Sequence, residues 1–213
     1  MQEIFLFLKQ PSYNEDFRKF DIKIFLSLAL IYFISVIPIG IILFFVSKLL
    51  DYQHKISFLT FEEKILYVLL LAPIIEEVFF RLIYIFTRRN LIILIVTTLG
   101  LLMFYIIKKN LISIILFSSL TLIYLIGFFY FQKYKDFFIC HFKFWFYFIA
   151  VIFAILHIFN FFGITISNII FAPLFVIPQL ILGIILGYIR VTYGFIYTVF
   201  FHMVINSTIL FQL

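Results

Sequence analysis

The sequence is poor in charged residues, which make up only 12% of its 213 positions, whereas hydrophobic residues make up 66%. Soluble domains of this size carry charge at about a quarter of their positions. The shortage excludes a water-soluble fold and indicates an integral membrane protein. Cys140 is the only cysteine, so a disulfide framework is excluded as well. The net charge of +6 comes from short segments between apolar runs and does not indicate a nucleic-acid partner.

Most of the sequence consists of long apolar runs. A membrane-spanning helix needs about 20 apolar residues, and seven segments approach or exceed this length: residues 22–47, 64–87, 91–107, 111–132, 142–161, 168–189 and 191–212. We predict an all-α, polytopic membrane protein with about seven transmembrane helices in one bundle.

The polar positions divide this chain into three parts. Residues 1–21 form a polar N-terminal segment, and residues 22–63 contain the first transmembrane helix and a loop. Residues 64–213 form the core, within which we expect residues 91–132 to be an inserted helical hairpin that turns at two lysines.

The basic residues predict the orientation, because cytoplasmic loops of membrane proteins are enriched in Lys and Arg. Seven spans place ten basic residues on the side of the N-terminus: Lys9, Arg18, Lys19, Lys23, Arg88, Arg89, Lys133, Lys135, Lys143 and Arg190. Only five lie on the opposite side: Lys48, Lys55, Lys64, Lys108 and Lys109. We therefore expect a cytoplasmic N-terminus. We also expect a multi-pass protein of a bacterial-type plasma membrane, surrounded by lipid.

Five ionisable residues interrupt the apolar segments. Glu76 and Glu77 are the only acidic residues inside one, and Arg81, His157 and His202 accompany them. Each charged side chain at the centre of a bilayer costs roughly 3 kcal/mol on insertion scales. A neutralising pair of Glu77 with Arg81, four residues on, accounts for two of the five. It leaves the others unexplained, so we interpret the set as a functional site.

The depth of these residues supports one shared site. Glu76 lies 12 residues from Arg88, His157 lies 14 from Lys143, and His202 lies 12 from Arg190. At 1.5 Å per helical residue, the three side chains share a level roughly 18 to 21 Å from the same membrane side. We predict a site at mid-bilayer.

The residue types restrict the chemistry of this site. The sequence has no HExxH motif of a zinc protease, and its four aspartates all lie in terminal or loop segments, which excludes a membrane-embedded aspartyl dyad. A carboxylate in surroundings of low polarity accepts a proton more readily and can act as a general base on water. Amide and imidazole groups aimed at one point can stabilise an oxyanion. This combination favours hydrolysis of a peptide or ester by an activated water.

Three motifs carry a family resemblance: EExxxR over residues 76–81, FxxxH over 153–157 and HxxxN over 202–206. In this order, each within an apolar segment, they resemble the CAAX prenyl protease and bacteriocin-processing superfamily, also called the Abi or CPBP intramembrane proteases. The resemblance covers residues 64–87 and 150–213. The segment between the first two motifs is longer than in typical bacterial members, and we attribute the excess to the hairpin 91–132.

The resemblance implies an intramembrane endopeptidase, a hydrolase that cleaves a peptide or lipidated protein substrate without a cofactor. It implies that Glu76 and His157 activate the water and that Glu77 and Arg81 orient the site. His202 and Asn206, the last of the matched residues, would form the oxyanion hole.

Three alternatives remain open. One is a metal-dependent protease in which Glu76, His157 and His202 bind zinc, because an open zinc site needs only three protein ligands. Another is a non-catalytic membrane scaffold or a bacteriocin-immunity-like protein. The third is a small proton-coupled transporter, since carboxylates and histidines within the membrane also relay protons.

Overall fold

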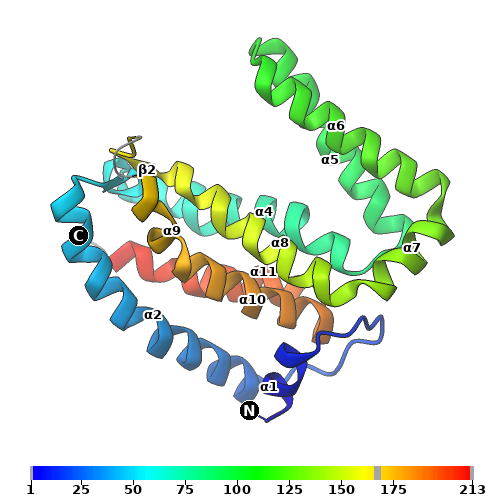
Figure 1. Cartoon of the computed structure of the whole chain (residues 1–213), viewed down its shortest axis with the longest axis horizontal. Coiled ribbons are helices and arrows are strands. Elements are labelled where there is room, and N and C mark those ends of the chain that lie inside the picture. Colours follow the sequence, from blue (N-terminus) through cyan, green and yellow to red (C-terminus); the bar gives the residue numbers. More distant parts are fainter. Residues whose placement is uncertain (1, 166–168, 212–213) are drawn as a thin grey trace.

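The chain folds almost entirely into helices in the computed structural model, which describes residues 2–165 and 169–211 (Figure 1). The prediction of an all-α protein is confirmed. In chain order the elements are α1 (Gln2–Lys9), α2 (Ile22–Leu50), β1 (Gln53–His54), η1 (Lys55–Phe58), α3 (Phe61–Glu63), η2 (Lys64–Leu71), α4 (Ala72–Arg81), η3 (Leu82–Tyr84), α5 (Arg88–Ile107), α6 (Leu111–Phe129), α7 (Phe131–Cys140), α8 (Phe142–Leu156), η4 (His157–Asn160), β2 (Phe161–Phe162), η5 (Ile169–Phe171), α9 (Ala172–Phe175), α10 (Ile177–Thr192), α11 (Phe195–Asn206) and η6 (Ser207–Phe211).

Four helices in the described ranges are long and apolar enough to cross a membrane: Ile22–Leu50, Arg88–Ile107, Leu111–Phe129 and Phe142–Asn160. A fifth span results if Ile169–Phe175 and Ile177–Thr192, which are bent by 41° relative to each other, are counted as one. These helices are consistent with a multi-pass membrane protein.

The two remaining predicted segments take other forms. Residues 64–87 divide into helical pieces of different type, and α11 is only 12 residues long. Residues 168 and 212, at the ends of two predicted segments, lie outside the described residues.

Two predicted boundaries are wrong. The residues between the predicted segments 111–132 and 142–161 are largely helical rather than a loop: α7 occupies Phe131–Cys140, where Gln132 donates a hydrogen bond to Asp136 one turn later and Phe138 is buried. The last helix begins at Phe195 rather than at residue 191, because the chain turns at Gly194, whose φ of 100° is readily adopted only by glycine.

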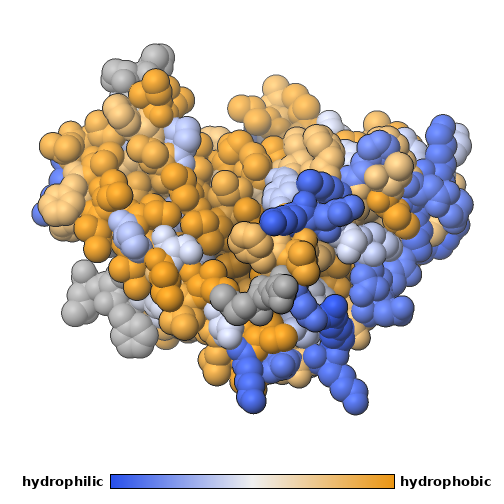
Figure 2. All heavy atoms as spheres, turned by 60° about the horizontal axis from the view of Figure 1, so that its bottom comes forward, coloured by the Kyte–Doolittle hydropathy of each residue, from blue (hydrophilic) through white to orange (hydrophobic). Residues whose placement is uncertain are grey.

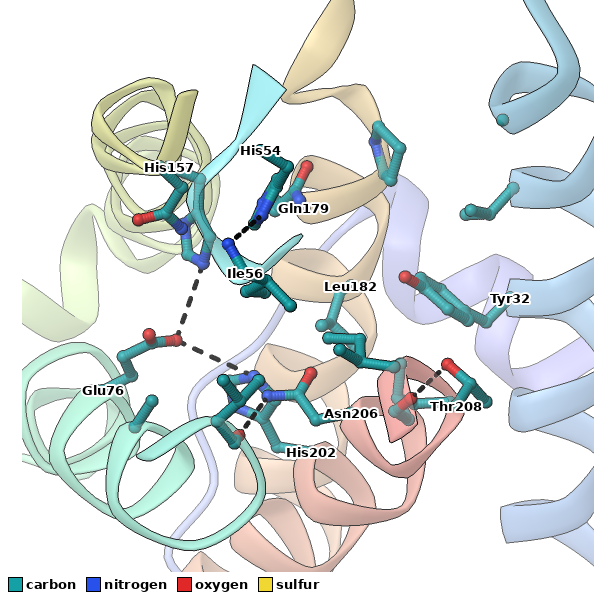
Figure 3. A pocket seen from close by; sticks show the side chains of 18 of the residues that line it. Tyr32, His54, Ile56, Glu76, His157, Gln179, Leu182, His202, Asn206 and Thr208 are labelled. Atoms are coloured by element: carbon teal, nitrogen blue, oxygen red, sulfur yellow. Dashed lines mark hydrogen bonds and ion pairs between the residues drawn. The ribbon is translucent and has the colours of Figure 1, made fainter. Parts of the chain in front are cut away.

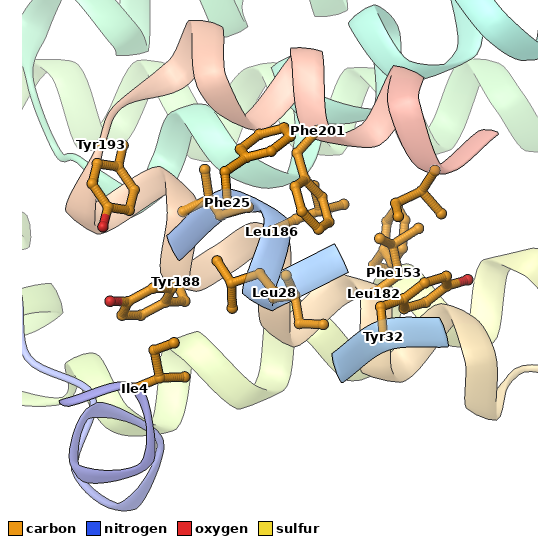
Figure 4. Packing of buried hydrophobic residues seen from close by; sticks show 13 residues of the cluster. Ile4, Phe25, Leu28, Tyr32, Phe153, Leu182, Leu186, Tyr188, Tyr193 and Phe201 are labelled. Carbon is orange, nitrogen blue, oxygen red and sulfur yellow. The ribbon is translucent and has the colours of Figure 1, made fainter. Parts of the chain in front are cut away.

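Helix α10 lies at the centre of the molecule and packs against α8, α2, α11 and α4. Every residue from Leu182 to Thr192 except Ile184 is buried. Figure 4 shows Leu182 and Leu186 of α10 between side chains of α2, α8 and α11. Gly187 permits close approach on the other side: a Cβ atom there would lie 2.7 Å from the ring of Phe146 and 3.0 Å from that of Tyr84.

The helical hairpin stands apart from this core. Its helices α5 and α6 pack mainly against each other, and they contact the rest of the protein at their base and where Phe117 of α6 meets Phe79 of α4 (Figure 1). The structure therefore differs from a single seven-helix bundle, because two of the predicted helices share few contacts with the others. Asn90 attaches the base: its side-chain amide donates to the carbonyl oxygens of Leu82 and Ile85 at 3.1 and 2.7 Å.

The N-terminal segment packs against one end of the core. Tyr13 donates to Glu15 at 2.7 Å and accepts from the backbone N–H of Phe86 at 3.1 Å. Glu15 also pairs with Lys135 of α7 at 2.5 Å, which lowers the pKa of the Glu15 carboxyl. Figure 2 shows hydrophilic side chains gathered toward the side where this segment and α7 lie in Figure 1, and a largely hydrophobic surface over the remainder of that face.

Candidate active site

A cavity of about 600 Å³ lies between α2 and the core helices, and four of the six predicted site residues line it. Glu76 comes from α4, His157 from the start of η4 directly after α8, and His202 and Asn206 from α11 (Figure 3). Glu77 and Arg81 lie behind this wall and are fully buried. The structure thus brings together all six residues from three separate regions of the sequence.

The Glu76 carboxylate lies between two imidazoles. Its Oε2 atom is 3.7 Å from Nε2 of His157 and 3.7 Å from Nε2 of His202. The Glu76 side chain is 26% exposed, whereas that of the adjacent Glu77 is 0% exposed. Consecutive residues of an α-helix point about 100° apart. The two glutamates therefore have separate surroundings, and only Glu76 faces the cavity.

The backbone fixes the proton position on His157. Its Nδ1 atom is 2.7 Å from the carbonyl oxygen of Phe153, which can only accept a hydrogen bond. Nδ1 therefore carries the proton, and in the neutral ring Nε2 presents a lone pair toward Glu76. The Phe153 ring, 4.6 Å from the imidazole between centroids, packs against it and restricts its rotation.

Glu77 connects Arg81 to His202. Its Oε1 atom is 3.0 Å from Nδ1 of His202, and its Oε2 atom is 3.4 Å from Nε of Arg81. The second contact is an ion pair without hydrogen-bond geometry, and no nitrogen of the Arg81 guanidinium has a hydrogen-bond partner within the described residues. The guanidinium lies 4.5 Å from the ring centroid of Phe153, where a cation–π interaction stabilises its charge.

Asn206 connects α11 to the π-helical turn that precedes α4. In η2 (Lys64–Leu71), which is a π-helix, the N–H of Ala72 bonds to the carbonyl of Tyr67 five residues earlier. In the same register the carbonyl of Val68 would bond to residue 73, but Pro73 has no N–H. The Asn206 amide donates to this carbonyl instead, at 3.0 Å.

Arg190 further supports the helix that carries Glu77. The Arg190 side chain is buried, and its Nε donates to the carbonyl oxygen of Arg81 at 2.9 Å. This bond satisfies a carbonyl at the end of α4, where the backbone changes to the 3₁₀-helix η3. The sequence placed Arg190 only between the predicted segments 168–189 and 191–212.

Sequence reasoning did not assign His54 or Gln179 to the site, although both line the same cavity. His54 was assigned to a loop, yet β1 pairs with β2 so that His54 lies opposite Phe161, four residues after His157. Gln179 lies in the first turn of α10. Neither residue belongs to one of the three motifs, and local spacing could not place them, because a two-residue strand pairing and a helix bend bring them to the cavity.

The geometry gives the zinc alternative no support. Within residues 2–165 and 169–211, no group of three or more His, Cys, Asp or Glu side chains is arranged to hold a metal ion. Both ring nitrogens of His202 lie opposite carboxylates, Nδ1 at Glu77 and Nε2 at Glu76.

Comparison of the chain with protein-family models, curated proteins and solved structures gave no match.

Proposed function

We propose that the chain is a glutamate-type intramembrane endopeptidase of the CAAX prenyl protease/Abi type, which hydrolyses a peptide bond of a membrane-associated substrate. One observation carries the proposal: the Glu76 carboxylate lies 3.7 Å from Nε2 of both His157 and His202 in the wall of a cavity large enough for a peptide segment. Three separate helical segments supply these groups, although each charged residue within a membrane is costly.

Glu76 and His157 have the arrangement needed to activate water. A water between them would donate hydrogen bonds to the Glu76 carboxylate and to the lone pair on Nε2 of His157. The water oxygen then attacks the substrate carbonyl carbon, and its proton moves to Glu76. When the tetrahedral intermediate collapses, the C–N bond breaks and Glu76 returns this proton to the leaving amine.

His202 and Asn206 would stabilise the oxyanion of that intermediate. The amide of Asn206 has two N–H groups, and the bond to Val68 uses one of them. Nε2 of His202 can donate only when the ring is doubly protonated, because Glu77 faces Nδ1.

The opposite wall of the cavity favours a substrate that comes from the membrane. Helix α2 contributes Tyr32, Phe33, Val36, Ile37 and Gly40 to it, all without charge. The second half of α2 has no buried residue, and its buried positions, Phe25, Leu28 and Tyr32, all lie in the first half. A hydrophobic peptide or a lipidated protein tail is therefore the class of substrate that fits.

The placement in the membrane belongs to the same proposal. We infer seven membrane-crossing segments, counting residues 61–84 and α11 with η6 as spans, with Glu76 near mid-bilayer and the N-terminus in the cytoplasm of a bacterial-type cell. Single cysteines at Arg89 and Asn110, both exposed, test this in a Cys140→Ser background. An externally added thiol reagent should label position 110 and not position 89.

The decisive experiment compares the peptides formed in membranes that contain the wild-type protein with those formed by Glu76→Gln. This substitution keeps the size of the side chain and removes the base. New peptide termini should appear only with the wild type, while both proteins are produced in equal amount. Equal termini would disprove the protease and leave the scaffold or transporter. Insensitivity of the cleavage to chelators would exclude the zinc alternative.

A further inference from the structure

His54 and Gln179 form a polar pair in the cavity wall, away from the three sequence motifs. Figure 3 shows both side chains close together, on the side of the cavity across from Glu76 and His202. One residue comes from the loop after α2 and the other from the first turn of α10. The reaction proposed above uses neither of them.

The backbone fixes the orientation of the His54 ring and the position of its proton. Nδ1 of His54 accepts a hydrogen bond from the N–H of Ile56 at 3.1 Å. Nδ1 is therefore unprotonated, and the single proton of the neutral ring lies on Nε2. The ring of Phe161 packs edge-on against the imidazole at 4.7 Å between centroids. His54 thus presents a fixed N–H donor at the cavity.

Burial keeps this donor uncharged. His54 lies outside the apolar segments, and its desolvation, together with repulsion from His157, lowers its pKa to about 4. At neutral pH the ring therefore donates a hydrogen bond without bringing a positive charge next to the Glu76 site. A neutral donor of this kind suits a neutral acceptor such as a peptide carbonyl.

Gln179 supplies the complementary acceptor. Its Oε1 atom has no hydrogen-bond partner among the residues that the structure describes, and neighbouring atoms cover it, so the carboxamide must turn to present this oxygen to the cavity. Leaving a buried amide oxygen unpaired costs free energy, and such a group in a cavity wall is a candidate for ligand binding. The donor that suits it is an N–H group.

We propose that His54 and Gln179 bind a peptide group of the substrate, with Nε2–H of His54 donating to its carbonyl oxygen and Oε1 of Gln179 accepting from its N–H. The inference rests on the proposed function and deepens it, because it assigns a backbone-binding subsite next to the reacting bond. A pair that contacts only backbone atoms tolerates different side chains. Selectivity then arises from the apolar wall of α2.

A binding experiment tests this pair without any turnover. The probe is N-dodecanoyl-Leu-Leu-Leu-amide, together with analogues in which one peptide bond at a time is replaced by an ester, which has no N–H. The full-length Glu76→Gln protein in lipid nanodiscs keeps the probe intact, and isothermal titration calorimetry measures the affinity. At one position the ester should bind on the order of 10-fold more weakly, because Gln179 then remains unpaired.

Variants of Gln179 and His54 identify the residues responsible. Adding Gln179→Leu should weaken the binding of the amide probe on the order of 10-fold and should remove the difference between amide and ester. Adding His54→Phe, which keeps a ring against Phe161, should weaken every probe by a similar factor, and His54→Gln, which retains an N–H donor, should restore most of the affinity. Gln53→Leu is the matched control, because Gln53 is exposed on the same short strand.

Three results would overturn the proposal. One is no binding of the probe to a folded Glu76→Gln protein, and another is unchanged affinity after both Gln179→Leu and His54→Phe. The third is a difference in affinity between amide and ester probes that persists after Gln179→Leu. Thermal unfolding of each variant shows whether the protein is folded. Equal peptide termini from the wild type and Glu76→Gln, with probe binding intact, would disprove the protease but not the peptide site. Cleavage with unchanged affinity in the variants would disprove the site alone.

Discussion

The core around α10 and the α5–α6 hairpin are both apolar, but they use their polar side chains differently. In the hairpin the hydroxyls of Thr97, Thr98, Ser119 and Thr121 bond to carbonyl oxygens of their own helix, four residues earlier. In the core, polar side chains connect different elements: His202 with Glu77, Asn206 with Val68, Arg190 with Arg81, and Tyr84 with Phe146.

This difference implies that insertion into the membrane and formation of the site depend on different polar contacts. A helix that satisfies its own polar groups is stable in lipid without specific neighbours. Helices whose polar groups depend on one another must adopt one mutual arrangement, because each unpaired group in an apolar environment is costly. We therefore expect the hairpin to be replaceable as a unit and the core to be sensitive at single residues.

Deletions in the hairpin should produce the largest effect, and its direction should depend on the number of helices removed. Removing residues 91–132 as a unit preserves the direction of α8 and the bonds of Asn90 to Leu82 and Ile85. This protein should insert and retain activity. Removing 111–132 alone should invert the later helices and abolish activity. Protease protection in membrane vesicles reports the orientation, and identical behaviour of both deletions would contradict the hairpin interpretation.

Glu77→Gln should be the most damaging conservative substitution in the core. It leaves the buried Arg81 without its counter-ion and weakens the contact with His202, which by analogy with other broken buried pairs costs about 3–5 kcal/mol. Yield and thermal stability should fall together with activity. Glu77→Gln with Arg81→Gln should recover part of the yield, whereas Glu76→Gln should leave yield unchanged. A stable and active Glu77→Gln protein would refute these roles.

The same substitution, Gly→Ala, tests the packing of both regions when it is made once in the core and once in the hairpin. At Gly187 the new Cβ would clash with the fully buried rings of Phe146 and Tyr84, which should cost about 1–3 kcal/mol. At Gly100 in α5 no atom lies within 4 Å of the new Cβ, and alanine favours the helix by about 1 kcal/mol. Unfolding midpoints should therefore fall for Gly187→Ala and rise slightly or stay constant for Gly100→Ala. Equal shifts would contradict the difference in packing.

The smallest expected effect concerns pH and His54. Its pKa of about 4 in the folded protein lies below the ordinary value of 6.5, so the unfolded chain binds the proton more tightly. The stability that this difference provides is present above about pH 6.5 and is lost as the pH falls toward 4. Between pH 7.5 and pH 5 the unfolding midpoint of the wild type should fall several degrees further than that of His54→Phe. Parallel curves would show that His54 is not buried as described.

The sequence was informative where residue type and spacing along one helix determine the structure. The apolar runs predicted the helical class, and the i,i+4 spacing of Glu77 and Arg81 predicted their contact. Equal depth in the membrane predicted that Glu76, His157 and His202 meet. The sequence failed where contacts between distant segments decide the outcome: α7 forms in a segment rich in lysine, the hairpin stands apart from the core, and the pairing of β1 with β2 carries His54 to the cavity.

The widened turn in Lys64–Leu71 has a consequence for how this region tolerates changes of length. A π-helix holds an extra residue relative to an α-helix, so removal of one residue from 64–71 can be absorbed by conversion to α-helical bonding. The Glu76 side chain would then keep its direction toward the two imidazoles. A deletion between Leu71 and Glu76 has no such reserve and turns the carboxylate by about 100°. Within residues 64–76, the π-helix is therefore the one place where a residue can be deleted while the Glu76 side chain still points at the two imidazoles.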